Sequence, residues 1–314
     1  MTQPGGGSLD PQGPVAEAMA DLWWLMLGLG SAVFVVVAVL LVMALFRRRP
    51  DAELRPGEKT PHRFDRWMIA GGVVMPLIVL VVVFGATLQA MRFVPNTAPP
   101  EALVVEVVGH QWWWEVRYPD EGITTANELH IPVGRPVALQ LTSADVIHSF
   151  WVPRLGGKMD LLPDGTNTLV LEADEPGEHH SQCAEFCGLQ HANMGLVVVA
   201  EPQERFASWV DDRKGPAVEP TVATVRRGRD IFLASDCASC HAIRGTTADA
   251  TAGPDLTHFA SRSTLGAGVL PNTPANLADW VADPHAIKDG VEMPAAELTD
   301  EQLDAVLVYL DDLE

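Results

Sequence analysis

The sequence has few basic residues. Lys and Arg together number 21, against 41 Asp and Glu among 314 residues, and the formal net charge is −20. Proteins that bind nucleic acid rely on Lys and Arg to neutralise phosphates. A chain this acidic is therefore not a general nucleic-acid binder, whereas basic proteins are suitable partners.

The sequence also lacks the common catalytic signatures. It contains no Walker loop, no Rossmann fingerprint and no recognisable nucleophile triad. Cysteine is scarce too, with only four residues, arranged as the pairs Cys183/Cys187 and Cys237/Cys240. Closely spaced pairs indicate metal or haem sites rather than a disulfide framework.

Charged residues are absent from two long stretches. Leu22–Phe46 and Trp67–Met91 each run for 25 residues without Asp, Glu, Lys or Arg. About 20 apolar residues suffice to cross a bilayer core. We therefore predict two membrane-spanning helices within residues 22–92, which makes the lipid bilayer a partner of this chain.

The distribution of charge predicts how these helices are oriented. The loop 47–66 holds seven Lys and Arg, whereas the tail 1–21 holds none. Basic loops stay in the cytoplasm. We therefore expect a multi-pass protein of the cell (plasma) membrane, with both termini on the extracytoplasmic, or periplasmic, side. The part after Arg92 carries 13 Lys and Arg against 34 Asp and Glu, so it holds essentially all the excess negative charge.

The part after Arg92 divides into two regions that differ in the spacing of their apolar residues. Short β-type runs separated by turn signals predict a β-sandwich or barrel; they are LVVEVV, WWWEVRY, ELHIPV, VALQLT, TLVLEA and LVVVA. Apolar residues at helical spacing follow in VRRGRDIFLAS, PANLADWVADP and TDEQLDAVLVYLDDL, the last with a predicted cap at Thr299. We predict a β domain at 93–212, a linker at 213–220 and an all-α domain at 221–314.

Soft metal ligands gather in the β domain. The stretch HHSQCAEFCGLQHANM holds Cys183, Cys187, His191 and Met194, and His148 lies upstream. Thiolate, imidazole and thioether together favour copper, and two thiolates can bridge two copper ions. Zinc and a Cys183–Cys187 disulfide are the alternatives, although Met is not a zinc ligand.

A second redox motif lies in the α domain. Cys237-Ala-Ser-Cys240-His241 is a C-x-x-C-H haem c attachment motif, in which both thiols bond the haem and the histidine is an axial ligand. A redox dithiol or half of a zinc site would need a context that this segment lacks. Met293 is the only Met after Met194, and His258 and His285 compete with it for the other axial position.

Together these features resemble subunit II of a haem–copper cytochrome c oxidase of the caa type. The two spans, a cupredoxin-like domain and CAEFCGLQHANM carry the resemblance over about residues 10–212, and a resemblance to a small class I cytochrome c covers about residues 221–313. It implies a multidomain membrane protein: a two-helix transmembrane hairpin, a cupredoxin-like β-sandwich and an all-α cytochrome c domain. It also implies a dinuclear copper centre, CuA, held by His148, Cys183, the Glu185 carbonyl, Cys187, His191 and Met194, and it makes Met293 the second axial haem ligand.

The resemblance assigns further roles. The Glu185 side chain would face a Mg²⁺ or Mn²⁺ site shared with subunit I, a cation that a carboxylate suits, unless it is simply solvated. Trp112 in GHQWWWEVRY would receive the electron from an external cytochrome c, unless the three tryptophans only pack the sandwich. Asp145 could orient His148, dock a basic partner or cap a turn. Ile69 stands where many relatives carry a Glu near a proton channel, which puts proton uptake through this chain in doubt.

The implied function is electron transfer within an oxidase. Electrons from cytochrome c, tethered or external, or from a cytochrome bc complex would pass through haem c and CuA to haem a in subunit I. That subunit would reduce O₂ to water with proton translocation, and subunit III would be a further partner. The alternatives are a CuA-containing nitric oxide reductase subunit and a membrane-anchored redox carrier without an oxidase.

Overall fold

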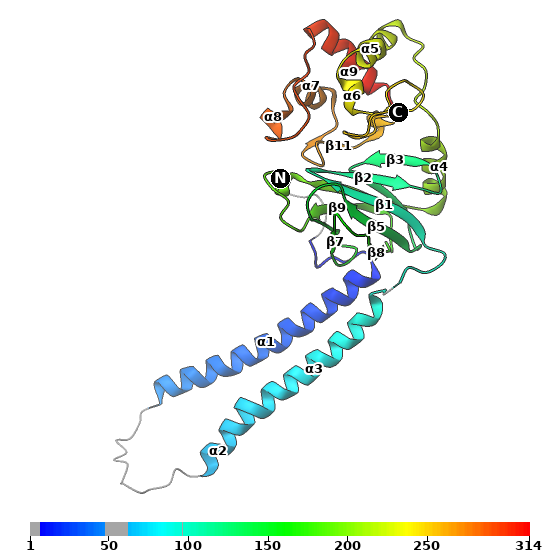
Figure 1. Ribbon diagram of the computed structural model, residues 1–314. Helices are drawn as coiled ribbons and strands as arrows, with labels where there is room; N and C mark the ends of the chain where they lie inside the picture. The colour runs from blue at the N-terminus through cyan, green and yellow to red at the C-terminus, as the bar shows by residue number, and fades with distance from the viewer. Residues whose placement is uncertain (1–6, 48–61, 96) are drawn as a thin grey trace. The chain divides into compact units, whose positions relative to one another are not determined.

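Figure 1 shows the computed structural model, which describes residues 7–47, 62–95 and 97–314. The predicted loop 47–66 and the start of the tail 1–21 therefore lie largely outside the described residues. The described chain separates into two compact units, one within Glu17–Pro95 and the other formed by the remaining residues.

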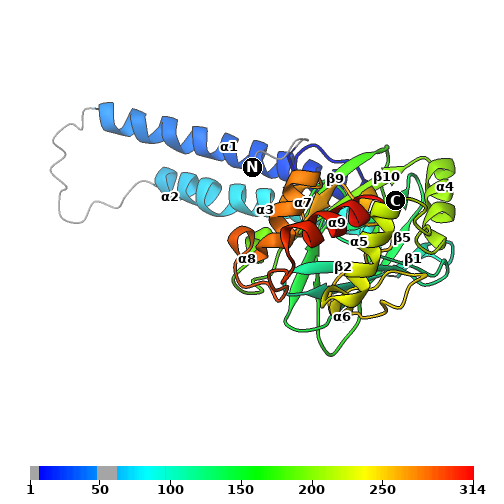
Figure 2. The same ribbon diagram turned by 90° about the horizontal axis from the view of Figure 1, so that it is seen from above.

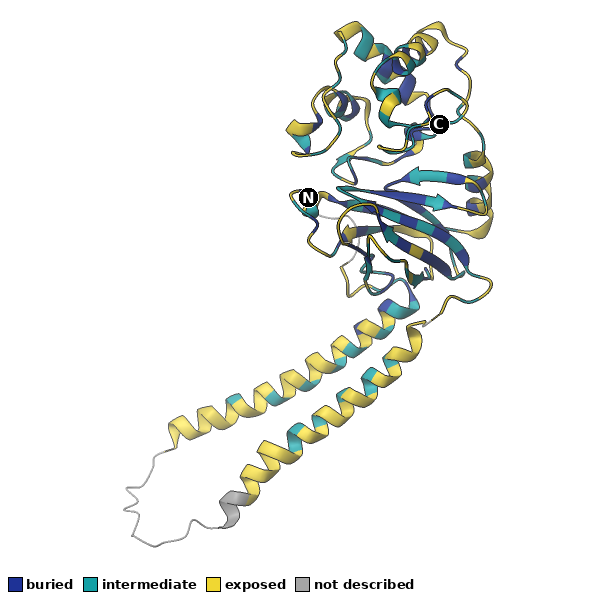
Figure 3. Ribbon diagram, in the orientation of Figure 1, coloured by how far each residue is buried: buried dark blue, intermediate teal, exposed yellow. Residues whose placement is uncertain are grey.

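Long apolar helices make up the unit within Glu17–Pro95. Helix α1 (Pro14–Phe46) begins eight residues before the uncharged stretch that starts at Leu22. The second helical rod consists of consecutive segments, α2 (His62–Ile69), the π-helical turn η1 (Ala70–Val74), α3 (Met75–Ala90) and the 3₁₀ turn η2 (Met91–Phe93). The apolar windows of both rods are unburied, as the mostly yellow ribbons of Figure 3 show, and both are long and apolar enough to cross a membrane.

The π-helical turn lies directly before Pro76. Proline has no amide hydrogen, and its ring crowds the carbonyl four residues earlier, so it normally breaks or kinks a helix. Here the amide of Met75 donates to the carbonyl of Ala70, five residues back. The wider turn lets the helix continue through Pro76, and the sequence pattern alone did not indicate it.

Two five-stranded sheets form the β domain. The first has the order β3-β2-β1-β5-β8 and the second β4-β10-β9-β6-β7. The strands of the first are β1 (Leu103–His110), β2 (Trp113–Tyr118), β3 (Ile123–Ala126), β5 (Val137–Ser143) and β8 (Asn167–Leu171). Those of the second are β4 (Glu128–Pro132), β6 (His148–Trp151), β7 (Met159–Leu161), β9 (Gly177–Cys183) and β10 (Gly195–Glu201).

One apolar core joins the two sheets. Buried and half-buried residues alternate along β1, as the two-residue period of a strand requires. Trp114 and Phe150 meet edge to face in this core, with ring centroids 5.6 Å apart, and both are fully buried. The copper-type ligands Cys183, Cys187 and Met194 belong to the same buried cluster. The candidate site is therefore partly built into the core of the sandwich.

The apolar runs located part of this sandwich. All six predicted runs are strands, namely β1, β2, β4, β5, β8 and β10. The pattern missed β3, β6, β7 and β9, which are short or polar. It also missed helix α4 (Gln203–Lys214), which extends two residues into the segment predicted as linker at 213–220.

The C-terminal part is helical, as predicted. Its helices are α5 (Ala223–Ala234), α6 (Cys237–Cys240), α7 (Pro274–Ala282), α8 (Pro284–Ile287) and α9 (Asp300–Asp311), with the 3₁₀ turn η4 (Phe259–Ser261) and the two-residue strands β11 (Thr264–Leu265) and β12 (Leu270–Pro271). Thr299 and Gln302 form the predicted cap of α9, as a reciprocal capping box.

Helices α5 and α9 lie side by side, as Figures 1 and 2 show. Their contact depends on a glycine, because a Cβ at Gly228 would collide with the carbonyl of Ala305 on α9. Phe232 and Tyr309 pack edge to face beneath this crossing, and both are buried. Helix α5 ends at Ala234, three residues before Cys237, so the packing of α5 on α9 positions the chain that enters the Cys237–Cys240 turn.

Candidate functional site

Two strands and one loop bring the predicted copper ligands together. His148 is the first residue of β6, and Cys183 is the last residue of β9. The loop that follows β9 carries Cys187, the 3₁₀ turn η3 (His191–Asn193) and Met194, and then enters β10. Phe150 pairs with Cys183 across β6 and β9, which fixes the register between the two strands.

The ligand atoms converge at distances suited to a pair of metal ions. The two sulfurs, Cys183 Sγ and Cys187 Sγ, are 3.7 Å apart, and both cysteines are free. Cys183 Sγ lies 3.9 Å from His148 Nδ1, and Cys187 Sγ lies 3.6 Å from His191 Nδ1 and 3.9 Å from Met194 Sδ. The structure therefore offers two thiolates with one imidazole beside each, a soft donor set that fits copper.

The two thiols are close enough for one to hydrogen-bond the other, and this shifts the pKa of each in opposite directions. The hydrogen bond from Cys187 lowers the pKa of Cys183, and the same interaction raises the pKa of Cys187. One thiolate is thus stabilised by the other cysteine's proton. Metal ions bind thiolates, so loading the site releases the remaining proton.

Glu185 takes part through its backbone. Its carbonyl oxygen lies 3.2 Å from Cys183 Sγ, so this oxygen faces the ligand cluster. Its side chain is exposed. Among the described residues, the only group of three His, Cys, Asp or Glu ligands within 4.8 Å of one another is His148, Cys183 and Cys187. The Glu185 carboxylate is not part of such a group.

The three adjacent tryptophans have three different surroundings. Trp114 is fully buried in the sandwich core, and Trp113 stacks on His110 with ring centroids 4.2 Å apart. Trp112 instead donates from Nε1 to the carbonyl of Cys187 at 2.9 Å, and the side chain of Gln111 donates to the same carbonyl at 2.7 Å. Trp114 also donates from Nε1 to this loop, at 3.4 Å from the carbonyl of Met194, but it is fully buried, whereas Trp112 is partly exposed.

The haem-attachment motif forms a single helical turn. Cys237 and Cys240 are the first and last residues of α6, so their thiols lie on one face. His241 follows, with Nδ1 2.8 Å from the carbonyl of Pro254. This contact leaves Nε2 free to bind iron, and burial lowers the pKa of His241, which favours the neutral ligand form.

Gly253 packs against the ring of His241. A Cβ at this position would lie 2.7 Å from His241 Cε1, so only glycine lets the backbone approach the imidazole so closely. The free thiol pair, the oriented histidine and this cradle fit a covalently bound haem. Sequence reasoning identified the motif but not the role of Gly253.

The competitors of Met293 are occupied or exposed. His258 is held by two carbonyls, with Nδ1 2.7 Å from Glu314 O and Nε2 3.2 Å from Gly215 O. His285 is exposed on α8. Met293 is partly buried and packs against the core of the helical domain.

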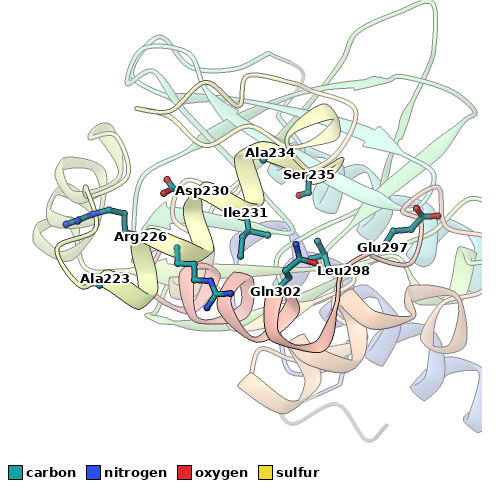
Figure 4. Close-up of a pocket in the computed structure, with 10 residues that line it drawn as sticks. Ala223, Arg226, Asp230, Ile231, Ala234, Ser235, Glu297, Leu298 and Gln302 are labelled. Atoms are coloured by element: carbon teal, nitrogen blue, oxygen red, sulfur yellow. The ribbon is translucent and has the colours of Figure 1, made fainter.

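A shallow pocket lies elsewhere on the helical domain, between α5 and the approach to α9 (Figure 4). Its volume is about 580 Å³, and Ile231, Ser235, Glu297 and Leu298 are among its lining residues. None of the thiols, the histidine or the methionine discussed above lines it. The pocket is therefore separate from both candidate redox sites.

The β domain and the helical domain contact each other directly. Glu128 accepts hydrogen bonds from the amide and hydroxyl of Ser263, at 2.5 and 2.7 Å. The amide of Gly195, next to Met194, donates to Ala267 O at 2.8 Å. Lys288 donates to the carbonyl of Trp112 at 2.7 Å. The two candidate redox sites thus lie in domains that are packed together.

Comparisons with known proteins agree with this arrangement. The family described as "Cytochrome C oxidase subunit II, periplasmic domain" matches residues 121–201, and "Cytochrome c" matches residues 225–314. Cytochrome c oxidase subunit 2 of Alkalihalophilus pseudofirmus is 37% identical, over 96% of this chain and 89% of that protein. The subunit of the same name from Bacillus subtilis is 31% identical, over 96% and 90%. Quinol oxidase subunit 2 of Bacillus spizizenii is 31% identical, over 68% of each chain.

Two long apolar helices, a thiolate-rich sandwich site and a domain with a C-x-x-C-H motif fit a subunit of a haem–copper oxidase. The match to the Alkalihalophilus pseudofirmus subunit, over 96% of this chain and 89% of that protein, shows the family. This chain belongs to the cytochrome c oxidase subunit 2 family, with a cupredoxin-like domain and a fused cytochrome c domain, and it is part of a haem–copper oxidase. Membership implies CuA and haem c as its cofactors and other oxidase subunits as its partners.

Proposed function

We propose that this chain passes electrons from cytochrome c, its own domain or an external protein, through haem c and CuA to haem a of subunit I. When bound, the two cofactors supply one-electron redox chemistry near the protein surface. The residues of this chain hold them, set their surroundings and bring them close together. Subunit I would reduce O₂ to water with proton translocation, subunit III would complete the complex, and a cytochrome bc complex is a further donor.

We assign the two copper ions of CuA to His148, Cys183, the Glu185 carbonyl, Cys187, His191 and Met194. The convergence of their donor atoms supports this set. Two thiolates 3.7 Å apart could bridge two ions, and each sulfur has a nitrogen of a different histidine beside it. Met194 is the weak axial donor, which mainly tunes potential.

We assign haem c to Cys237 and Cys240 as thioether sites, with His241 and Met293 as axial ligands. The hydrogen bond from His241 Nδ1 to Pro254 O orients the imidazole. The carbonyl contacts of His258 and the exposure of His285 leave Met293 as the favoured second ligand. A histidine–methionine pair raises the haem potential and suits electron transfer.

One observation carries the proposed route, the hydrogen bond of 2.9 Å from Trp112 Nε1 to the carbonyl of Cys187. It connects a partly exposed aromatic ring to a copper ligand through one hydrogen bond and the backbone of that ligand. Trp112 is therefore the proposed electron-input residue. The contact of Lys288 with the Trp112 carbonyl brings the cytochrome domain to the same place.

The remaining assignments concern the surroundings of the chain. We propose that α1 and the helix Arg66–Phe93 cross the plasma membrane, with both redox domains on the extracytoplasmic side. The exposed Glu185 carboxylate is proposed to face a Mg²⁺ or Mn²⁺ ion at the contact with subunit I. Such a shared site would explain why no second ligand group within the described part of this chain accompanies it.

The test is purification of the complex from native membranes, with identification of its subunits and analysis of metals and haems. We expect two copper ions and one covalent haem per copy of this chain, together with a large polytopic haem subunit. A partner whose active site carries non-haem iron would point to a nitric oxide reductase instead. Isolation of this chain without a haem-bearing partner would indicate a free redox carrier.

A further inference from the structure

Lys288 is a buried cation at the contact between the two redox domains. It follows α8, and only 1% of its surface is exposed. Its Nζ donates to Trp112 O in the cupredoxin-like domain and to Gly266 O in the cytochrome domain, both at 2.7 Å. One side chain thus connects the backbone of the proposed electron-input residue to two segments of the cytochrome domain.

The ammonium has no acidic partner among the described residues. Its hydrogen-bond partners there are the two carbonyl oxygens, and burial lowers the pKa of Lys288 to about 7, although Cys187 opposes this shift. In its protonated form Nζ donates to both carbonyls at once, and hydrogen bonds from a charged donor are short and strong.

The two residues that follow Lys288 contact the copper-ligand loop and lie close to Trp112. Gln190 Nε2, in the copper-ligand loop, donates to Asp289 O at 2.7 Å. Gly290 has a φ of +78°, and a Cβ there would lie 3.1 Å from Leu189 Cδ2 and 3.8 Å from the Trp112 ring. Segment 288–290 therefore lies against both Trp112 and the copper-ligand loop.

We propose that Lys288 is the positioning residue that fastens the cytochrome domain onto Trp112 for electron transfer to the copper site. This inference rests on the proposed route through Trp112. The contacts Glu128–Ser263 and Gly195–Ala267 hold the two domains together elsewhere, but neither reaches Trp112. Lys288 exchanges no electron or proton in this role, because it sets only the distance and orientation of the two redox partners.

The experiment uses the purified holo-oxidase with Lys288→Met, which keeps the length of the side chain and removes its hydrogen-bond donors. Flash photoreduction would measure electron transfer from haem c to CuA, and hydrogen–deuterium exchange would measure opening of segment 288–290. We expect the transfer rate to fall at least about tenfold, because the substitution removes both hydrogen bonds that Nζ donates, and loss of even one hydrogen bond from a charged donor produces a change of that size. We also expect exchange of the segment to rise.

Two comparisons separate positioning from general damage. Direct reduction of CuA by a small photoreductant should keep its wild-type rate in Lys288→Met, because the copper ligands are untouched. Lys214→Met is the matched control, since Lys214 is exposed and pairs with Glu121 away from Trp112. It should leave both the transfer rate and the exchange of segment 288–290 unchanged.

Wild-type transfer and exchange in Lys288→Met would overturn the inference. If that variant does not fold, Gly290→Ala tests the same segment, because alanine strains a backbone whose φ is +78° and crowds Leu189 Cδ2. A wild-type transfer rate in Gly290→Ala would then overturn it.

Slow transfer in Lys288→Met with normal transfer in Trp112→Phe would keep the role of Lys288 and reject the route through Trp112. The reverse pattern would reject the role of Lys288 alone.

Discussion

The carboxylate of Asp145 holds the imidazole of His148 from the side opposite the sulfurs. Asp145 Oδ1 lies 2.8 Å from His148 Nε2, while His148 Nδ1 points at Cys183 Sγ. A second carboxylate oxygen accepts the amide of Gln111 at 2.6 Å, so Asp145 is itself fixed. Of the roles that the sequence left open for Asp145, this geometry favours the orienting one. The contact places the proton on Nε2 and leaves Nδ1 free for a metal ion.

Asp145→Asn should therefore weaken copper binding without removing a ligand. Partners of this kind typically contribute 10- to 100-fold to metal affinity, and we expect a loss of about that size. Copper retention during titration with a competing chelator measures it. Asp164→Asn is the matched control, because Asp164 is exposed in a loop away from the ligands. Equal retention in the two variants would contradict the orienting role.

Loss of either bridging sulfur should abolish the two-copper centre. Cys183→Ser and Cys187→Ser each leave one thiolate, which cannot bridge two ions symmetrically, and His191→Ala removes one of the two imidazoles. Met194→Leu should be milder, because the axial thioether is the weakest bond. Electron paramagnetic resonance of the oxidised protein checks this. A wild-type signal from an electron confined to one copper ion would refute the dinuclear assignment.

Trp112→Phe should slow electron input while leaving the copper ligands in place. Phenylalanine keeps an aromatic ring but cannot donate to the Cys187 carbonyl. Flash photoreduction of the complex would follow electron arrival at CuA. Trp113→Phe is the control, because Trp113 stacks on His110 and makes no contact of this kind. Equal rates in the two variants would remove Trp112 from the route.

Met293→Leu should change the haem iron without releasing the haem. The attachment through Cys237 and Cys240 and the ligand His241 are untouched, so the protein should keep its colour. Loss of a thioether that favours the ferrous state should lower the haem potential. The weak sulfur-to-iron charge-transfer band of the oxidised protein is the measurement. Persistence of that band in Met293→Leu would disprove the assignment, as would its loss on changing His258 or His285.

The interface near Glu128 should make domain stability depend on pH. His130 Nδ1 lies 3.0 Å from Glu201, and its Nε2 lies 3.8 Å from Glu128, which in turn accepts from Ser263 of the cytochrome domain. Burial alone would lower the pKa of His130, but the two carboxylates outweigh burial and raise it. The protonated form is therefore the one that the folded state stabilises.

The sign of the effect follows from this raised pKa. The stabilisation is fully present below the ordinary histidine pKa of about 6.5 and is lost as the pH rises through the higher folded value. His130→Gln should thus lower the melting temperature most at acidic pH, and the difference from wild type should shrink as the pH rises. His285→Gln, at an exposed position, controls for the substitution itself. A difference that grows with pH would contradict the argument.

Prediction from the sequence succeeded where local pattern carries the information. The apolar runs located six strands because residues such as Val105 and Val107 alternate with more exposed neighbours. It failed for β6 and β9, where HSFW and GEHHSQC show no apolar alternation. These strands are strands because they pair with β7 and β10, and they carry His148 and Cys183.

The sequence indicated which residues could bind a metal ion or haem, but it did not indicate how those residues are arranged in space. The residue types and spacing of Cys183, Cys187, His191 and Met194 favoured copper over zinc or a disulfide, and those of Cys237, Cys240 and His241 indicated a haem c attachment site. Long uncharged stretches likewise determined the two apolar helices, because length and composition decide them. Only the tertiary structure decided that Asp145 orients His148, that Trp112 reaches the Cys187 carbonyl, and that Lys288 joins the two domains. These contacts span 3, 75 and 176 residues, and the two long ones depend on packing between distant segments that no local pattern encodes.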